Sequence, residues 1–141
     1  MNKISAILFD IDGVILRRPY YFSEDLERRG YRNVVLTLNK YFNGHDHHHC
    51  CEGQSDTLTI ITPYLKKFSW RGTAREYLRQ QFDFERNFLD QELVLLIKKI
   101  KSFGIGCYLC SDQEKYRAEY ILKEMDNIRG DLETIVKETQ N

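Results

Sequence analysis

The chain has 141 residues, the usual length of one domain, and its 42% hydrophobic, 13% aromatic and 30% charged residues are typical of a globular protein. The chain has 21 lysines and arginines and 21 aspartates and glutamates, so its formal net charge is zero. The net charge therefore gives no reason to expect nucleic acid or an anionic membrane as a partner. No apolar run approaches the roughly 20 residues that are needed to span a bilayer. The apolar run near the N-terminus is also too short for the h-region of a signal peptide, so a cytoplasmic location is expected.

An apolar run over residues 5–9 stops at Asp10, and Gly13 follows shortly after. The length of this run and its boundaries favour a buried strand over a helix. Residues 17–86 then form a long segment rich in tyrosine, phenylalanine and arginine. Pro63 is expected to start or interrupt an element within this segment. Apolar residues at helical spacing predict two helices there, one through Val34, Leu38 and Tyr41 and one through Ala74, Leu78 and Phe82.

The second half of the chain continues with helix, strand and helix. Apolar periodicity predicts a helix over residues 89–103 that ends at Gly104. A second buried strand follows over residues 106–109, and another helix over residues 113–125. This order is typical of a parallel sheet with helices on its faces. Because residues 17–86 are too many for a simple crossover, we expect them to form a helical cap on the sheet.

Two aspartates, Asp10 and Asp12, follow the first predicted strand. Side chains at i and i+2 point to the same side, so both should face one crevice at the carboxyl end of the strand, with Ile11 in the core. Two carboxylates this close repel each other unless a cation lies between them or one takes a proton. A bound Mg²⁺ would resolve the repulsion, and a carboxylate can attack phosphorus to give an aspartyl-phosphate that water hydrolyses.

The same segment carries a resemblance to a known family. Residues 10–14 (DIDGV) resemble motif I of the haloacid dehalogenase (HAD) superfamily, and residues 109–113 (LCSDQ) resemble its motif II. The resemblance covers most of the chain. It implies an α/β fold with a partial Rossmann-like parallel sheet as its core, formed by residues 1–16 and 87–141, and an inserted α-helical cap formed by residues 17–86.

The resemblance also implies roles for single residues. Asp10 matches the nucleophile and a Mg²⁺ ligand, and Asp12 matches the general acid/base whose backbone carbonyl binds the metal. Ser111 matches the hydroxyl that binds the transferred phosphoryl group, and Asp112, beside it in the phosphate site, takes a place often held by asparagine. A carboxylate at position 12 is absent from true dehalogenases, so the resemblance implies a Mg²⁺-dependent phosphatase of a small phosphorylated metabolite.

Two later signatures of that family, a lysine and an acidic pair, are not found in this sequence. Residues 130–137 fit either a third strand or a helix capped by Asp131, and the pattern favours the helix. Lys137 lacks the proline that follows the family's lysine. We therefore interpret the chain as C-terminally truncated, with a non-catalytic fragment or binding module as the alternative. So few strands leave an unpaired sheet edge, through which self-association is expected.

Residues 45–51 (HDHHHCC) contain all four histidines. Imidazole and thiolate suit Zn²⁺, but no second cluster supplies paired ligands and adjacent residues rarely converge on one ion. The pattern favours a polar cap loop over a metal site. The four cysteines are expected to be free thiols rather than a disulfide framework, namely Cys50, Cys51, Cys107 and Cys110.

Overall fold

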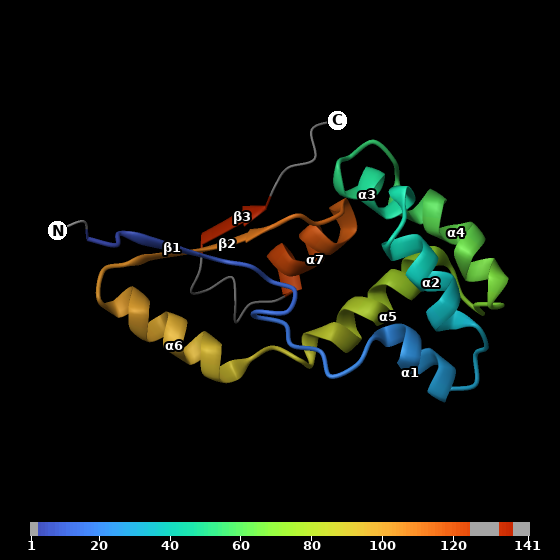
Figure 1. Cartoon of the computed structure of the whole chain (residues 1–141), viewed down its shortest axis with the longest axis horizontal. Helices are drawn as coiled ribbons and strands as arrows, with labels where there is room; N and C mark the ends of the chain where they lie inside the picture. Colours follow the sequence, from blue (N-terminus) through green and yellow to red (C-terminus); the bar gives the residue numbers. More distant parts are fainter. Residues whose placement is uncertain (1–2, 125–132, 137–141) are drawn as a thin grey trace.

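The structure, a computed structural model, describes residues 3–124 and 133–136 and is a mixed α/β fold that is mostly helical. Along the chain (Figure 1) the elements are β1 (Ala6–Phe9), α1 (Phe22–Arg28), α2 (Val34–Phe42), α3 (His45–Cys51), α4 (Thr57–Lys67), α5 (Ala74–Arg86), α6 (Gln91–Ser102), β2 (Gly106–Ser111), α7 (Lys115–Glu124) and β3 (Glu133–Val136). No helix in this described part has the length and apolar character needed to cross a membrane.

The strands β1 and β2 are parallel neighbours, as the order of elements predicts. Their register pairs Ala6 with Gly106 and Phe9 with Leu109, so both strands end at the same edge of the sheet. Helix α6 lies beneath them in Figure 1 and contacts β2. On the other side Leu8 is 59% exposed. The expectation of a buried first strand is therefore wrong for this face, because no described element shields Leu8.

The third strand corrects another expectation. The segment for which the sequence pattern favours a helix contains β3, which pairs in parallel with β2 from Tyr108 opposite Glu133 to Ser111 opposite Val136. Pairing with the open edge of β2 satisfies backbone groups on both strands, and such long-range pairing overrides a local helical pattern. Asp131 and Lys137 lie outside the described residues.

The helices that flank β2 follow the predicted pattern. The carboxylate of Asp90 caps α6 by accepting the backbone N–H of Leu93 at 3.0 Å. Gly104 follows the helix at a φ of +80°, a left-handed conformation that glycine adopts without strain. Helix α7 begins two residues later than expected because the Glu114 carboxylate accepts the backbone N–H groups of Tyr116 and Arg117 at 3.0 and 2.6 Å.

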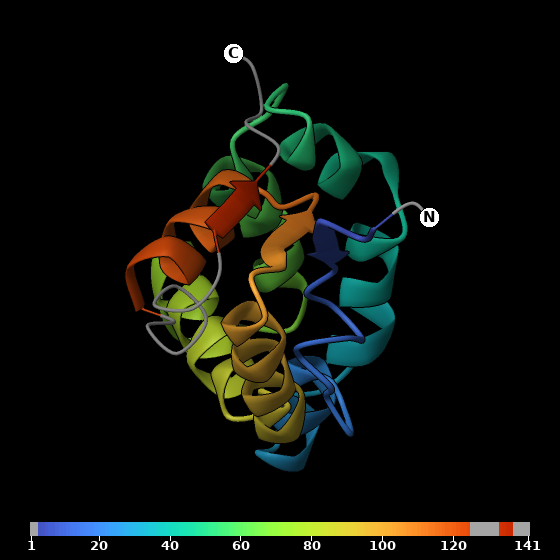
Figure 2. The ribbon, with the colours of Figure 1, turned by 90° about the vertical axis from the view of Figure 1, so that its left-hand side faces the viewer.

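Helices α1 to α5 pack together beyond the carboxyl ends of the strands (Figure 1; Figure 2 gives the view at 90°). Helix α1 contacts α2 and α5, and α4 contacts α2 and α5. The two helices predicted between residues 17 and 86 are confirmed as α2 and α5. Pro63 neither starts nor interrupts an element, since it lies inside α4. The buried face of α4, with Ile61 and Leu65 on either side of the proline, offsets the lost backbone hydrogen bond.

One continuous cluster of buried apolar residues joins the helices to the strands. Its members come from the turn after β1, from α1, α2, α4, α5, α6 and α7, and from β2. The largest fully buried apolar side chains are Tyr41, Tyr77, Ile11, Ile15, Leu16, Leu26, Leu38, Ile61, Ile97, Leu109 and Ile121. The helical segment and the strands therefore share one hydrophobic core.

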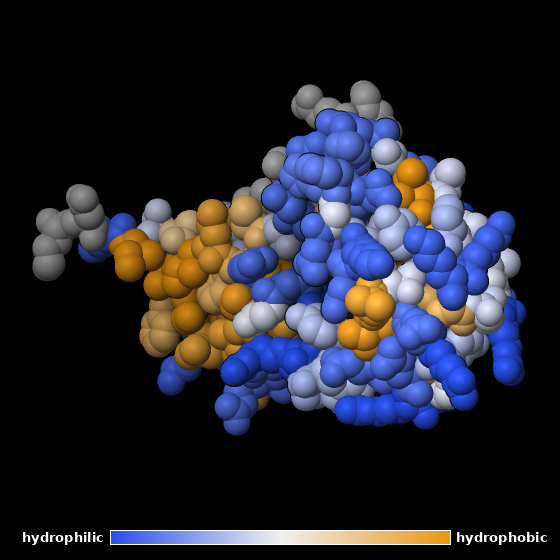
Figure 3. Space-filling view, turned by 45° about the vertical axis from the view of Figure 1, so that its right-hand side comes forward, coloured by the Kyte–Doolittle hydropathy of each residue, from blue (hydrophilic) through white to orange (hydrophobic). Residues whose placement is uncertain are grey.

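Apolar side chains also gather on the surface near β1 and α6 (Figure 3). Large apolar residues of these elements and their flanks are 51–72% exposed, namely Ile4, Leu8, Leu95, Leu96 and Phe103. Exposed apolar patches of this kind often mark contact surfaces. Self-association stays a prediction, and this surface is a candidate contact area for it.

Two leucines of α2 provide a direct test of the helical packing. Leu38 is 1% exposed and Leu36 is 62% exposed. We expect Leu38→Ala to lower the free energy of unfolding by about 2–5 kcal/mol, because it leaves a cavity in the core. Leu36→Ala, the matched control, should change it by no more than about 0.5 kcal/mol. Urea denaturation measures both, and equal losses would contradict the described packing of α2.

Candidate functional site

The residues expected at the strand ends lie there. Asp10 directly follows β1 and Ser111 is the last residue of β2, and the parallel register places both at the same edge of the sheet. The side chain of Asp10 is exposed, and its Oδ1 accepts the backbone N–H of Ile11 at 2.7 Å. Ile11 itself is fully buried, as the alternation of strand residues predicts.

The side chain of Gln113 connects the two strand ends. Its Nε2 donates to Ser111 Oγ at 2.7 Å and to Asp12 Oδ2 at 3.2 Å. Gln113 is 4% exposed and therefore holds this position within a packed environment. The Ser111 hydroxyl and the Asp12 carboxylate thus both lie within hydrogen-bonding distance of Gln113 Nε2. Asp112, next to Ser111, is exposed at the rim of the same region.

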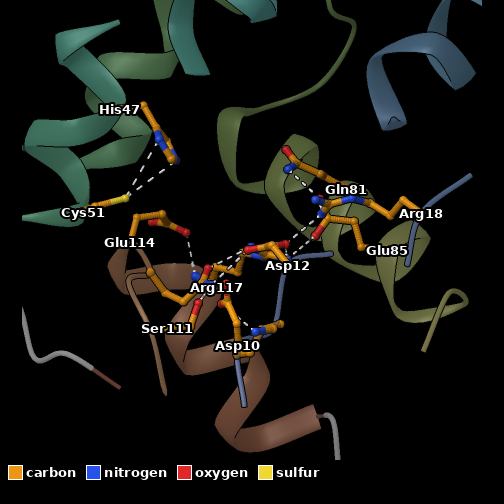
Figure 4. Close-up of polar contacts among 12 residues, drawn as sticks. Asp10, Asp12, Arg18, His47, Cys51, Gln81, Glu85, Ser111, Glu114 and Arg117 are labelled. Atoms are coloured by element: carbon orange, nitrogen blue, oxygen red, sulfur yellow. Dashed lines mark hydrogen bonds and ion pairs between the residues drawn. The ribbon is translucent and has the colours of Figure 1, made fainter. Parts of the chain in front are cut away.

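Asp12 is held by two arginines (Figure 4). Arg117 donates to both of its carboxylate oxygens, at 2.7 and 2.8 Å, and Arg18 lies 3.1 Å away. Burial by itself raises the pKa of Asp12, but the hydrogen bonds and charge of Arg117, together with Arg18, outweigh it and lower the pKa to about 2. In this arrangement Asp12 is an ionised ion-pair partner and has no proton to donate at neutral pH.

A second carboxylate completes the charged network. Glu85 is 5% exposed and lies 3.2 Å from Arg18 and 2.8 Å from Arg117. Gln81, one helical turn earlier on α5, donates its side-chain N–H to Glu85 at 3.0 Å. Two arginines and two carboxylates therefore alternate, and their charges cancel. Such a network is stable only while each charge keeps its partner.

Local sequence patterns do not predict this network. Its members come from the segment after β1, from α5 and from α7, and nothing local in the sequence links those three segments. One available signal was the spacing of Gln113 and Arg117, because residues four apart share a helix face. The same spacing relates Gln81 to Glu85 on α5.

A cavity of about 330 Å³ opens between the helices and the start of α7. Asp12, Arg18 and Arg117 lie along one part of its wall, and Tyr41 and His47 lie along another. Figure 4 shows that the charged network and His47 flank a common space. Polar groups that converge on a concave, partly apolar site are typical of small-molecule binding.

The histidine cluster is a helix, α3, rather than the expected loop. Its residues can pair along the helix, since His48 and Glu52 lie 3.0 Å apart and His47 Nε2 lies 3.8 Å from Cys51 Sγ. Burial lowers the pKa of His47 and raises the pKa of Cys51 to about 11, so the pair is a neutral imidazole beside a protonated thiol. All four cysteines are free, as predicted.

Zinc binding tests the role of α3. Within residues 3–124 and 133–136 no three histidine, cysteine or acidic side chains are grouped closely enough to hold a metal ion. We therefore expect calorimetric titration with Zn²⁺ to show only weak, non-specific binding. A tight one-to-one complex that is lost in His47→Ala and His49→Ala variants would contradict this expectation.

The strand ends offer a different kind of metal site. Mg²⁺ prefers oxygen ligands and is commonly held by one or two carboxylates together with water and a substrate phosphate. The exposed carboxylate of Asp10 has this chemistry, and the backbone carbonyl of Asp12 would be the second protein ligand. The donor set therefore fits Mg²⁺ shared with a phosphate, although not a cage built entirely from protein groups.

Comparison with protein-family models, with curated proteins and with solved structures found no match for this chain. The resemblance to the HAD superfamily therefore rests on the two sequence motifs.

Proposed function

We propose that this chain is a HAD-like hydrolase, a Mg²⁺-dependent phosphatase that acts on a small phosphorylated compound through an aspartyl-phosphate at Asp10. One observation carries the proposal: Gln113 bonds both Ser111 and Asp12 at the edge of the parallel strands where Asp10 emerges. Ligands of open parallel sheets bind at this edge. The partial Rossmann-like core and its helical cap are part of the same proposal.

In this mechanism an oxygen of Asp10 attacks the phosphorus atom, and the bond from phosphorus to the leaving oxygen breaks. The backbone N–H of Ile11 holds the other carboxylate oxygen, Oδ1, and so orients the nucleophile. The hydroxyl of Ser111 donates to a phosphoryl oxygen, while Gln113 fixes the position of that hydroxyl. Bound Mg²⁺ would neutralise the charge on the transferring phosphoryl group.

Protonation of the leaving oxygen requires a change at Asp12, because the two arginines keep it ionised. A phosphate dianion competes for the guanidinium of Arg117, since bidentate pairing suits phosphate as well as carboxylate. Once Arg117 turns to the phosphate, the pKa of Asp12 rises and the carboxyl group can carry the proton. Arg117 then stabilises the phosphoryl charge.

The second candidate function is a binding module without turnover. The ion pair of Asp12 with Arg117 favours it, because a permanent pair leaves no acid for the leaving oxygen. In that case the network is structural, and the cavity binds a ligand without changing it.

Hydrolysis of p-nitrophenyl phosphate separates the two candidates. We expect turnover that depends on Mg²⁺ and is lost when a chelator is added. Calorimetry with inorganic phosphate is measured on the same protein. Phosphate binding with no turnover at any Mg²⁺ concentration would support the binding module, and neither binding nor turnover would refute both functions.

A further inference from the structure

Glu85 Oε2 makes no hydrogen bond but is ion-paired with Arg117 at 2.8 Å. Two further buried polar groups of the cavity wall make no hydrogen bond among the described residues. They are Oε1 of Gln81 and the hydroxyl of Tyr41. Gln81 is 8% exposed and Tyr41 is 1% exposed. A buried polar atom without a partner destabilises the fold, so such atoms are uncommon and call for an explanation. A ligand in the cavity would supply the missing partners.

The orientation of Gln81 is set by the charged network. Its side-chain N–H donates to Glu85 at 3.0 Å, which turns Oε1 away from that carboxylate. In Figure 4 the amide end of Gln81 points toward the space that His47 faces from the other side. Oε1 can only accept a hydrogen bond, so its partner must be a donor.

Tyr41 occupies the opposite part of the wall, with its ring centroid 5.4 Å from that of His47 and 5.2 Å from that of Tyr64. Burial, followed by the neighbouring thiol of Cys50, raises the pKa of Tyr41, so the phenol stays protonated at neutral pH. It therefore donates one hydrogen bond and can accept another. A ligand hydroxyl is a suitable partner for both Tyr41 and Gln81, because it donates and accepts.

The charges of the cavity wall restrict the ligand further. Arg18 and Arg117 are balanced by Asp12 and Glu85, and the wall also includes the buried carboxyl group of Glu114. The cavity therefore has no excess of positive charge for a second anionic group. The part of a ligand that enters it should be uncharged and polar, while its phosphate stays at the strand ends.

We infer that this cavity binds the uncharged, hydroxyl-bearing part of a phosphorylated compound, with ligand hydroxyls bonded to Gln81 Oε1 and to the Tyr41 hydroxyl. The preferred substrate class is then a polyol or sugar phosphate, and alkyl and aryl phosphates should bind more weakly. This inference rests on the proposed function only for the place of the phosphate beside Asp10 and Ser111.

The test is calorimetric binding to the full chain carrying Asp10→Asn, with Mg²⁺ present, so that the ligands are not consumed. Glycerol, ribose and glucose phosphates are each compared with the alkyl phosphate of equal carbon number, namely propyl, pentyl and hexyl phosphate. We expect at least one hydroxylated compound to bind more tightly than its alkyl partner. Tyr41→Phe and Gln81→Met should each reduce that preference by about 2- to 12-fold.

Tyr64→Phe is the matched control, because the Tyr64 hydroxyl donates to Asp46 at 2.6 Å and Tyr64 is not part of the cavity wall. It should leave the preference unchanged. Tyr41→Phe should unfold at a temperature close to that of the parent, since the thiol of Cys50 beside the hydroxyl is only a weak hydrogen-bond partner. A preference that survives both cavity variants, or no preference for any hydroxylated compound, overturns the inference.

The two proposals fail in different ways. Hydroxyl-dependent binding in a protein that hydrolyses no phosphate ester would refute the phosphatase and support the cavity assignment. Mg²⁺-dependent hydrolysis without any preference for hydroxylated ligands would support the phosphatase and overturn the cavity assignment.

Discussion

Replacing Arg117 by methionine is expected to lower the free energy of unfolding by about 3 kcal/mol, the lower end of the range for breaking a buried ion pair. Its side chain is 13% exposed and contacts both Asp12 and Glu85, whose side chain is 6% exposed. The substitution leaves these two carboxylates to Arg18 alone. Because Arg18 still lies 3.1 and 3.2 Å from them, the loss should not reach the upper end of that range.

Urea denaturation of the variant measures this loss, and Arg79→Met is the matched control. Arg79 also pairs with two carboxylates, Asp83 and Glu124, but it is on the surface, where such pairs contribute little. The double variant Arg117→Met with Glu85→Gln should regain part of the stability, because it no longer buries an unpaired charge. Equal stability of Arg117→Met and the parent protein would show that the network does not hold the fold.

The same substitution should change the dependence of stability on pH. Since the pKa of Asp12 is lowered from 3.8 to about 2 by folding, its contribution is fully present above about pH 4 and is lost as the pH falls toward 2. Removing Arg117 removes the main cause of the lowered pKa. The variant should therefore lose less stability than the parent over this acid range.

Asp10→Asn is expected to abolish the proposed phosphatase activity, because an amide is not a competent nucleophile. The change is nearly isosteric, and the amide oxygen can still accept the backbone N–H of Ile11. The side chain is exposed, so the fold should keep its stability. Initial rates with p-nitrophenyl phosphate and Mg²⁺ measure the loss. Mass spectrometry of acid-quenched protein should detect a phosphoryl group on the parent chain and none on the variant.

The control is Asp46→Asn on α3, because Asp46 is not part of the cavity wall. Asp46 accepts the hydroxyl of Tyr64, and an amide oxygen can do the same, so this variant should retain both fold and turnover. Hydrolysis that persists in Asp10→Asn would mean that the activity has another source in the protein or comes from a contaminant.

Local patterns predict several parts of this molecule correctly. The apolar run before Asp10 and the run before Ser111 predict two strands, and the order of elements predicts that they are parallel. Periodic apolar residues predict α2, α5, α6 and α7 within a few residues of their bounds. These features depend on side-chain spacing and capping between neighbours in the sequence. They can therefore be predicted without knowledge of the tertiary structure.

Other features depend on segments that are distant in the sequence. The strand β3 forms because it can pair with the free edge of β2. The residues of β3 do not by themselves encode this pairing. The row of histidines predicts a loop, but these residues form helix α3. The helix is stabilised because its side chains pair along it and because it packs against α2 and α4.

The candidate site divides in the same way. Sequence alone determined that Asp10, Asp12 and Ser111 lie at the ends of two neighbouring strands, because alternation and strand order are local properties. Only the tertiary structure decided that Asp12 is an ionised partner of Arg117, and that Gln81 of α5 borders the same cavity. Protonation and ligand contacts depend on which charges and polar groups surround an atom in space, and distant segments supply those groups.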